Sequence, residues 1–126
     1  RPGKDLTIVA YQMMVKKALE AADVLAERGI EAEVVDPRTL VPLDMETIVR
    51  SVKKTNRVIV AGEETTTAGV CAEIGFRIMQ ETFDYLDAPV ERVASADVPV
   101  PFSPPLEKRM MAGTEDIIAA AERLLG

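Results

Sequence analysis

The sequence predicts a three-layer α/β/α sandwich around a mostly parallel sheet. Short, nearly all-apolar segments alternate four times with longer amphipathic segments, and this is the order of strands and crossover helices in a parallel sheet. Continuous apolar runs are typical of strands that helices cover on both faces. With 126 residues, the chain is long enough for one core. We expect a single domain over residues 1–126, with residues 1–5 as the remnant of a linker.

The first part of the chain predicts strand, helix and strand. Residues 6–11 are rich in β-forming apolar side chains. Residues 13–28 carry apolar side chains at helical spacing, which indicates an amphipathic helix, and Gly29 ends it. The apolar positions of this helix are Met14, Ala18, Ala21, Ala22 and Leu25. Residues 32–36 form the second predicted strand.

The middle of the chain repeats this order. Asp44 is the predicted N-cap of a helix that continues to residue 55. Residues 57–62 are the third strand, and a polar loop leads from it to a third helix that begins at residue 70. The residues expected on the inner side of that helix are Val70, Ile74, Ile78 and Phe83.

The last part of the chain contains a strand, a proline-rich segment and a final helix. Residues 89–94 are the fourth strand. Residues 95–112 contain four prolines, so we expect this segment to be extended, without a helix. Thr114 is the predicted N-cap of a helix that ends at residue 125.

Composition narrows the classes of partner. The net charge of −6 argues against binding to a nucleic-acid duplex or an anionic membrane, because phosphate contacts need clustered Lys and Arg. No apolar run approaches the ~20 residues of a membrane span. The single cysteine suits a reducing compartment, so we expect the cytoplasm or an organelle matrix.

Sites in parallel sheets lie beyond the carboxyl ends of the strands, and the residues expected there carry little reactivity. The chain has no histidine and neither glycine-rich phosphate motif. Glu63 and Glu64 follow a strand, as a general base or metal ligand would, or they belong to a solvated loop or pair with Arg38. Cys71 lies at the start of a helix, and a packed thiol is favoured over a nucleophile because no histidine exists to activate it.

Charged residues at turns are the remaining candidates. Arg38 is either a structural ion-pair partner of Asp36, Asp44 or a glutamate, or an anchor between subunits, because a guanidinium suits interface carboxylates. Asp84, Asp87 and Glu91 surround a turn. They are either solvated surface or an acidic region that attracts a basic partner.

Taken in order, the motifs resemble the C-terminal domain of the transketolase-like superfamily. They run from residues 3–10 through Asp36-Pro-Arg-Thr-Leu-Val-Pro-Leu-Asp44, Glu63-Glu64, residues 69–73, Leu86-Asp-Ala-Pro89 and residues 97–102. The nearest resemblance is to the β subunit of the E1 component of 2-oxo acid dehydrogenases of pyruvate, branched-chain or acetoin type. The family often has Gly-Gly where this chain has Ala68-Gly69.

This resemblance implies a non-catalytic assembly and docking domain. The full enzyme would use thiamine diphosphate and Mg²⁺, held outside this chain, to decarboxylate a 2-oxo acid and acylate lipoyl-E2. Implied partners are the E1 α subunit, a second β subunit and the peripheral-subunit-binding domain of E2. For E2 docking, the resemblance points to Asp87, with Asp84 and Glu91 beside it. The residues expected at subunit interfaces are Arg38, Thr39, Leu40, Pro42, Glu63, Glu64, Gly69 and Glu73.

Two alternatives remain open at this point. The chain is also compatible with the last domain of transketolase or deoxyxylulose-phosphate synthase, whose cofactor-binding half lies on the same polypeptide. It could also be a stand-alone interaction module, although its linker-like beginning argues against that.

Overall fold

Four parallel strands form the sheet in a computed structural model that describes residues 1–126. They are β1 (Leu6–Ala10), β2 (Ala32–Val35), β3 (Val58–Thr65) and β4 (Glu91–Ser95), and their order across the sheet is β2-β1-β3-β4. Ile8 in β1 is in register with Val34 on one side and with Ile59 on the other. Because all pairs are parallel, the carboxyl ends of the strands lie along the same side of the sheet, which is called the carboxyl edge below.

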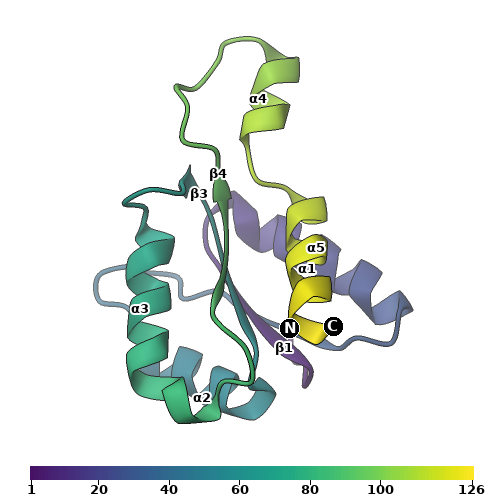
Figure 1. The fold of residues 1–126 in the computed structure, drawn as a ribbon, viewed down its shortest axis with the longest axis vertical. Helices are drawn as coiled ribbons and strands as arrows, with labels where there is room; N and C mark the ends of the chain where they lie inside the picture. Colours follow the sequence, from purple (N-terminus) through teal and green to yellow (C-terminus); the bar gives the residue numbers. More distant parts are fainter.

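Helices cover both faces of this sheet, as Figure 1 shows. Helices α1 (Met13–Glu27) and α5 (Thr114–Leu125) pack on one face, and α2 (Met45–Thr55) and α3 (Val70–Thr82) pack on the other. A short 3₁₀ turn, η1 (Phe83–Tyr85), follows α3 directly. The predicted three-layer α/β/α class is therefore confirmed. None of the helices combines the length and the hydropathy that crossing a membrane requires.

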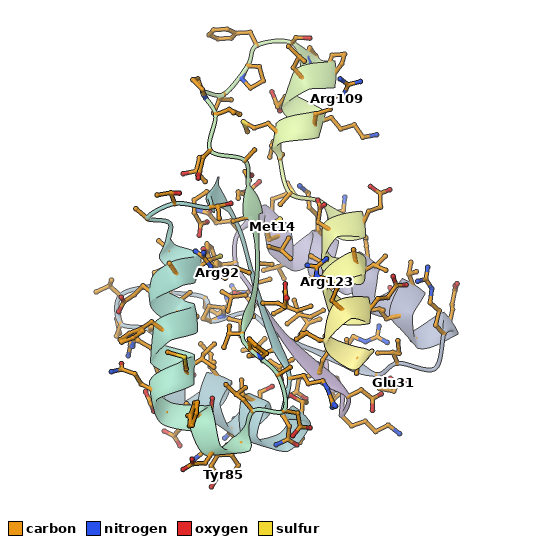
Figure 2. The ribbon with its side chains drawn as sticks, viewed as in Figure 1. Met14, Glu31, Tyr85, Arg92, Arg109 and Arg123 are labelled. Atoms are coloured by element: carbon orange, nitrogen blue, oxygen red, sulfur yellow. The ribbon has the colours of Figure 1, made fainter.

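Residues 97–111 extend away from these layers as an arm that carries helix α4 (Pro104–Met110) (Figure 1). The expectation that this segment contains no helix is wrong. Pro104 and Pro105 occupy the first turn of α4, where the backbone N–H groups have no intrahelical acceptor and their loss costs little. Arg109 lies on the arm in Figure 2, and Phe102, which belongs to the same segment, is fully exposed.

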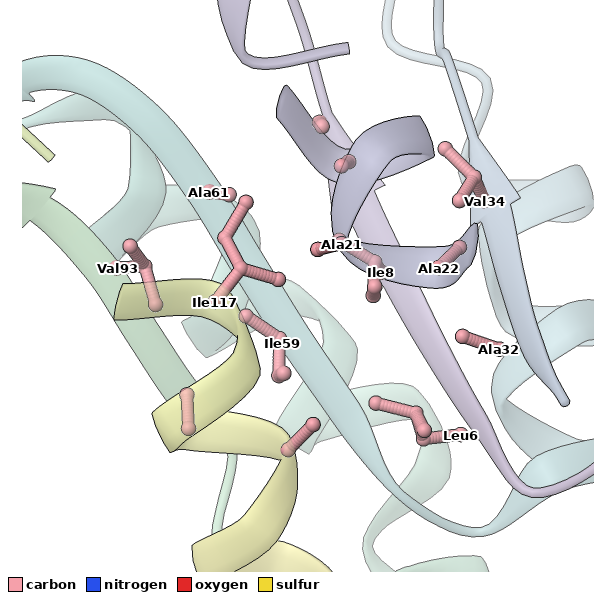
Figure 3. Close-up of a cluster of buried hydrophobic side chains, with 14 of the residues drawn as sticks. Leu6, Ile8, Ala21, Ala22, Ala32, Val34, Ile59, Ala61, Val93 and Ile117 are labelled. Atoms are coloured by element: carbon pink, nitrogen blue, oxygen red, sulfur yellow. The ribbon is translucent and has the colours of Figure 1, made fainter. Parts of the chain in front are cut away.

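The core consists of two clusters separated by the sheet. Leu6, Ile8 and Ala10 face α1 and α5, whereas Val9 and Tyr11 face α2 and α3, as the alternation of side chains along a strand requires. Figure 3 shows part of the first cluster, in which Ala21 and Ala22 of α1 lie against the strands. The apolar positions expected along the first helix are all buried, namely Met14, Ala18, Ala21, Ala22 and Leu25.

One network of polar side chains lies between β1 and α2. The Thr7 hydroxyl is buried in β1 and lies 2.8 Å from Ser51 Oγ and 2.7 Å from Thr55 Oγ1, both on α2. No buried side-chain nitrogen or oxygen lacks a hydrogen-bond partner. The hydroxyl groups therefore join β1 to α2 without an unsatisfied polar atom.

The helix ends confirm one predicted cap and correct another. Asp44 accepts a hydrogen bond from the Thr47 backbone N–H at 3.0 Å and caps α2, as expected. Thr114 is not the N-cap of α5, because that position is Gly113, whose N–H donates to Asp116 Oδ2 at 2.7 Å. Thr114 is instead the first helical residue, and its hydroxyl donates to Glu20 on α1.

The inner face of α3 also differs from the expected one. Ile74 and Ile78 are buried, as predicted, together with Cys71 and Thr82. Val70 and Phe83 are exposed because they lie at the two ends of the helix, beyond the part that the sheet covers.

The first residues of the chain follow β2. The Arg1 carbonyl accepts from the Val34 N–H at 2.9 Å, and the N–H groups of Lys4 and Asp5 donate to the Glu31 carbonyl. Residues 1–5, expected to be a linker, are thus hydrogen-bonded to the outer edge of the sheet.

Candidate functional site

The carboxyl edge of the sheet contains a cluster of three polar side chains, Tyr11, Glu64 and Cys71. Tyr11 follows β1, Glu64 belongs to the end of β3, and Cys71 lies in the first turn of α3. Glu64 Oε1 accepts from the Tyr11 hydroxyl at 2.6 Å and from the Cys71 backbone N–H at 2.8 Å. The Tyr11 oxygen also lies 3.3 Å from Cys71 Sγ. One carboxylate therefore joins two strands to the N-terminus of a helix.

The protonation of this cluster follows from burial and hydrogen bonding. Burial raises the pKa of the Glu64 carboxyl, but hydrogen bonds from Tyr11 and from Cys71 outweigh it, so the pKa is lower than the ordinary value. Burial and the hydrogen bonds to Cys71 and Glu64 raise the pKa of the Tyr11 hydroxyl. Burial raises the pKa of the Cys71 thiol to about 12. At neutral pH the cluster contains a carboxylate, a phenol and a thiol, which suits a packed Cys71 and no nucleophile.

The position of Glu64 corrects the sequence interpretation. Glu64 neither remains in a solvated loop nor pairs with Arg38; it binds Tyr11 and the first turn of α3. Its negative charge lies where the dipole of α3 favours an anion. The N-terminus of α3 is therefore occupied by an anion from the chain itself.

Two glycines make room for this carboxylate. A Cβ at Gly62 would collide with Glu64 Oε2, the Tyr11 hydroxyl and Cys71 Sγ, and a Cβ at Gly69 would collide with Glu64 Cγ. Ala68 has φ +59°, in the left-handed region that favours glycine. The Ala68-Gly69 pair therefore keeps the backbone path that a Gly-Gly pair would adopt more easily.

The first group of predicted interface residues forms one exposed loop after β2. Arg38 has φ +64°, its N–H donates to Asp36 Oδ1 at 2.9 Å, and its guanidinium lies 3.5 Å from Asp36 Oδ2. The Thr39 hydroxyl donates to the Pro42 carbonyl at 2.7 Å, and Leu40 forms a bridge with Leu43. One loop therefore contains Arg38, Thr39, Leu40 and Pro42. Of the ion-pair partners expected for Arg38, the structure shows Asp36.

The second group lies around the start of α3. Glu63 and Glu64 are in β3, Gly69 is the N-cap of α3, and Glu73 is exposed in its first turn. Of these, only Glu64 makes a side-chain hydrogen bond within the cluster described above. All four remain predicted interface residues.

The predicted docking acids surround the C-terminal end of α3 and the start of β4. Asp87 lies 3.5 Å from Arg57, and Glu91 lies 3.0 Å from Arg123. Asp84 is exposed in η1. Two of the three carboxylates are therefore partly neutralised by arginines of the same chain, so the region is less negative than the sequence suggested.

A hydrophobic groove lies next to Asp87, with a volume of about 820 Å³. One wall is α3, and the other is the segment that leads into β4, the edge strand. In Figure 2, Arg92 lies beside the upper half of α3 and Tyr85 lies below its C-terminal end. The lining residues are Ala72, Gly75, Phe76, Met79, Phe83, Leu86, Asp87, Ala88, Pro89, Val90 and Arg92.

Sequence reasoning missed this groove because it assigned α3 a single apolar face. Phe76, Met79 and Phe83 are 53%, 42% and 72% exposed, so they form a second apolar stripe beside the buried one. The spacing of three and four residues was visible in the sequence. The sequence does not show which of the two stripes faces the core, because both contain large hydrophobic residues.

The fold and this site define an α/β domain with a parallel sheet and an open apolar groove. The polar side chains at the carboxyl edge of the sheet are hydrogen-bonded to one another. The sequence model for "Transketolase, C-terminal domain" matches residues 1–117. The chain belongs to the transketolase C-terminal domain family.

Similar curated proteins include β subunits of the pyruvate dehydrogenase E1 component. The chain is 48% identical to a mitochondrial pyruvate dehydrogenase E1 component subunit beta of Dictyostelium discoideum, over 98% of this chain and 35% of that protein. It is 48% identical to the corresponding Rickettsia felis subunit, over 98% of this chain and 38% of that protein. The chain therefore spans about a third of the length of these relatives.

Solved structures agree with the fold. A split-gene transketolase, described as an inactive β4 tetramer, superposes with a TM-score of 0.80 at 35% identity, over 99% of this chain and 39% of that chain. A 2-oxoglutarate:ferredoxin oxidoreductase of Magnetococcus marinus superposes with a TM-score of 0.65 at 12% identity, over 100% of this chain and 18% of that one. The second likeness concerns the fold alone.

Proposed function

We propose that this chain is the C-terminal assembly and docking domain of the β subunit of a thiamine-diphosphate-dependent 2-oxo acid dehydrogenase E1 component. The observation that carries the proposal is the similarity to pyruvate dehydrogenase E1 β subunits, which extends over 98% of the chain at 48% identity. The parent enzyme would decarboxylate a 2-oxo acid and acylate lipoyl-E2. Its partners would be an E1 α subunit, a second β subunit and E2.

The residues of this chain do not fit a site for thiamine diphosphate and Mg²⁺. No three His, Cys, Asp or Glu side chains are arranged to hold a metal ion. The N-terminus of α3, where a diphosphate would be favoured by the helix dipole, faces the Glu64 carboxylate. This supports the proposal that other parts of the parent enzyme hold the cofactor, and we expect no heat of thiamine diphosphate binding when the isolated chain is titrated.

The docking role is tested at Asp87, which lies beside the groove and is exposed. Asp87→Lys in the intact E1 component should weaken binding of the E2 peripheral-subunit-binding domain by about tenfold or more, because a like charge would face a basic partner. Decarboxylation of the 2-oxo acid should be unchanged. Isothermal titration measures the first quantity and a steady-state decarboxylation assay the second.

The matched control is Glu27→Lys, which changes an exposed acid at the C-terminal end of α1, on the opposite face of the sheet from α3. It makes the same change of net charge away from the groove, so E2 affinity should stay at the wild-type value. Unchanged E2 affinity in Asp87→Lys, or an equal loss in both variants, would overturn the docking role.

A second candidate is the C-terminal part of a transketolase. The 35% identity and TM-score of 0.80 to a split-gene transketolase favour it, but the identity is lower than to the pyruvate dehydrogenase subunits. An assay of the complete enzyme with a 2-oxo acid and, separately, with a ketose phosphate distinguishes the two candidates.

A further inference from the structure

We propose that residues 65–69 form a lid over the cluster of Tyr11, Glu64 and Cys71, and that the arm holds this lid closed through Asp97. Displacement of the arm would then open the carboxyl edge of the sheet beside β3. The inference concerns contacts within this chain, so it does not depend on the identity of the parent enzyme.

The first argument is the path of the loop between β3 and α3. Gly69 lies so close to Glu64 that an added Cβ would be 2.4 Å from Glu64 Cγ and 2.5 Å from the Thr65 carbonyl oxygen. The first turn of α3 follows, and its Cys71 N–H donates to Glu64. Cys71 is 1% exposed. The loop therefore folds back over the carboxylate, and the buried thiol lies in the turn that the loop positions.

The second argument is that one carboxylate attaches the loop to the arm. Asp97 is the first residue of the arm, and it accepts from the Thr67 N–H at 2.9 Å and from the Thr67 hydroxyl at 2.5 Å. Thr66 is attached to the sheet instead, because its N–H and its hydroxyl both donate to the Ser95 carbonyl at 3.0 Å. Hydrogen bonds to an ionised acceptor are stronger than neutral ones. Asp97 is therefore the link through which the arm acts on the lid.

The third argument is the structure of the arm around Asp97. The Ala96 N–H donates to the Met110 carbonyl at 3.0 Å, so the two ends of the arm meet beside Asp97. Beyond Asp97, Val98 and Pro99 line one hollow together with Leu106 and Met110 of α4. Figure 1 shows that the arm leaves the sheet where β3 passes into the loop. The position of Asp97 is thus set by the packing of the arm on itself, and a change in the arm is felt at the lid.

The fourth argument is that the lid is held closed against strain. Residues 65–68 and Asp97 are exposed, and segments with exposed hydrogen bonds and few buried apolar contacts open locally. Ala68 has φ +59°, a conformation that a residue with a Cβ keeps only while its surroundings impose it. Opening of the lid relieves this strain. The lid should therefore open more often than the whole chain unfolds.

The test uses the single cysteine of the chain as a reporter of the open lid. The exposed Cys71 thiolate attacks dithiobis(nitrobenzoate), forms a mixed disulfide and releases nitrothiobenzoate, whose absorbance gives the labelling rate. Asp97→Ala should raise this rate about tenfold, because the lid loses its attachment to the arm. Glu107→Ala is the matched control. It removes an exposed carboxylate from the same arm, and it should leave the rate unchanged.

Two measurements separate lid opening from a general loss of stability. Ala68→Gly should lower the labelling rate about threefold, because glycine adopts a positive φ without strain. In Asp97→Ala, hydrogen exchange should be faster at the amides of residues 66–72 and unchanged at those of β1. An equal acceleration in β1 would mean that labelling follows unfolding of the whole chain, and it would overturn the lid.

The role of the arm is tested by replacing residues 98–109 with a short Gly-Ser linker that leaves Asp97 in place. The labelling rate should rise about fivefold, because Asp97 is no longer supported by α4. In the Asp97→Ala background the same replacement should have no further effect, since the lid is already detached. A replacement without effect on the wild-type chain, or two effects that multiply in the double variant, would show that the arm does not hold the lid.

Discussion

Glu64 joins β1 and β3 to α3 at the carboxyl edge of the sheet. Its replacement should lower the free energy of unfolding by an amount that follows from its hydrogen bonds. Glu64→Ala leaves the Tyr11 hydroxyl and the Cys71 N–H without their acceptor. Hydrogen bonds to charged groups contribute about 1.5–3 kcal/mol each. Water can reach the partly exposed carboxylate site, so we expect a total loss of about 2–3 kcal/mol in the free energy of unfolding.

A double-mutant cycle isolates the bond between Glu64 and Tyr11. The variants Glu64→Ala, Tyr11→Phe and the double variant are unfolded in urea and followed by circular dichroism. We expect a coupling energy of about 1.5 kcal/mol at pH 7. Glu63→Ala is the matched control, because its side chain makes no bond in the cluster, and it should change stability by less than about 0.5 kcal/mol.

The stability that the Glu64 carboxylate contributes should rise with pH. The pKa of Glu64 in the folded chain lies below its ordinary value of 4.5, so between these two values the unfolded chain binds more protons and stability rises with pH. The coupling should be complete above about pH 4.5 and should decline as the pH falls through the folded-state pKa. A coupling energy near zero at pH 7, or one that does not decline in acid, would show that the carboxylate does not hold these elements together.

Two further predictions concern the loop that surrounds Glu64. Gly62→Ala should lower the free energy of unfolding by about 2 kcal/mol or more, because the new methyl group would collide with Glu64, Tyr11 and Cys71; in the control Gly75→Ala, urea unfolding should show no comparable loss. Ala68→Gly should raise it by about 0.5–1 kcal/mol, because φ is +59° at this position. An Ala68→Gly variant that is less stable than wild type in the same assay contradicts the left-handed backbone at this residue.

Local patterns are sufficient for the elements that bury one clear face. They predict the stripe in α1 residue by residue, because Met14, Ala18, Ala21, Ala22 and Leu25 recur at helical spacing and all five are buried. Asp44 can be predicted as a cap because the free N–H groups of the first helical turn stabilise its carboxylate, and this local interaction does not depend on the rest of the fold. The strand–helix alternation likewise predicts the parallel sheet, since connections of this length and handedness allow few other arrangements.

The errors in α3 and in the arm have one physical cause. A phenylalanine on a helix is apolar whether a sheet covers it or not, so its pattern predicts a buried Phe83 although this side chain is 72% exposed. The density of prolines predicts an arm without a helix, but the effect of Pro104 and Pro105 depends on position, and the first turn tolerates them. Composition does not distinguish these situations.

The order of strands and helices, the covered stripe of α1 and the absence of histidine can all be read along the chain, because they depend on residue type and short spacings. The bond between Glu64 and Tyr11, 53 positions apart, and the groove next to Asp87 cannot. Each requires that β1, β3, α3 and β4 first pack side by side, and this packing is set by the sum of many weak contacts throughout the core.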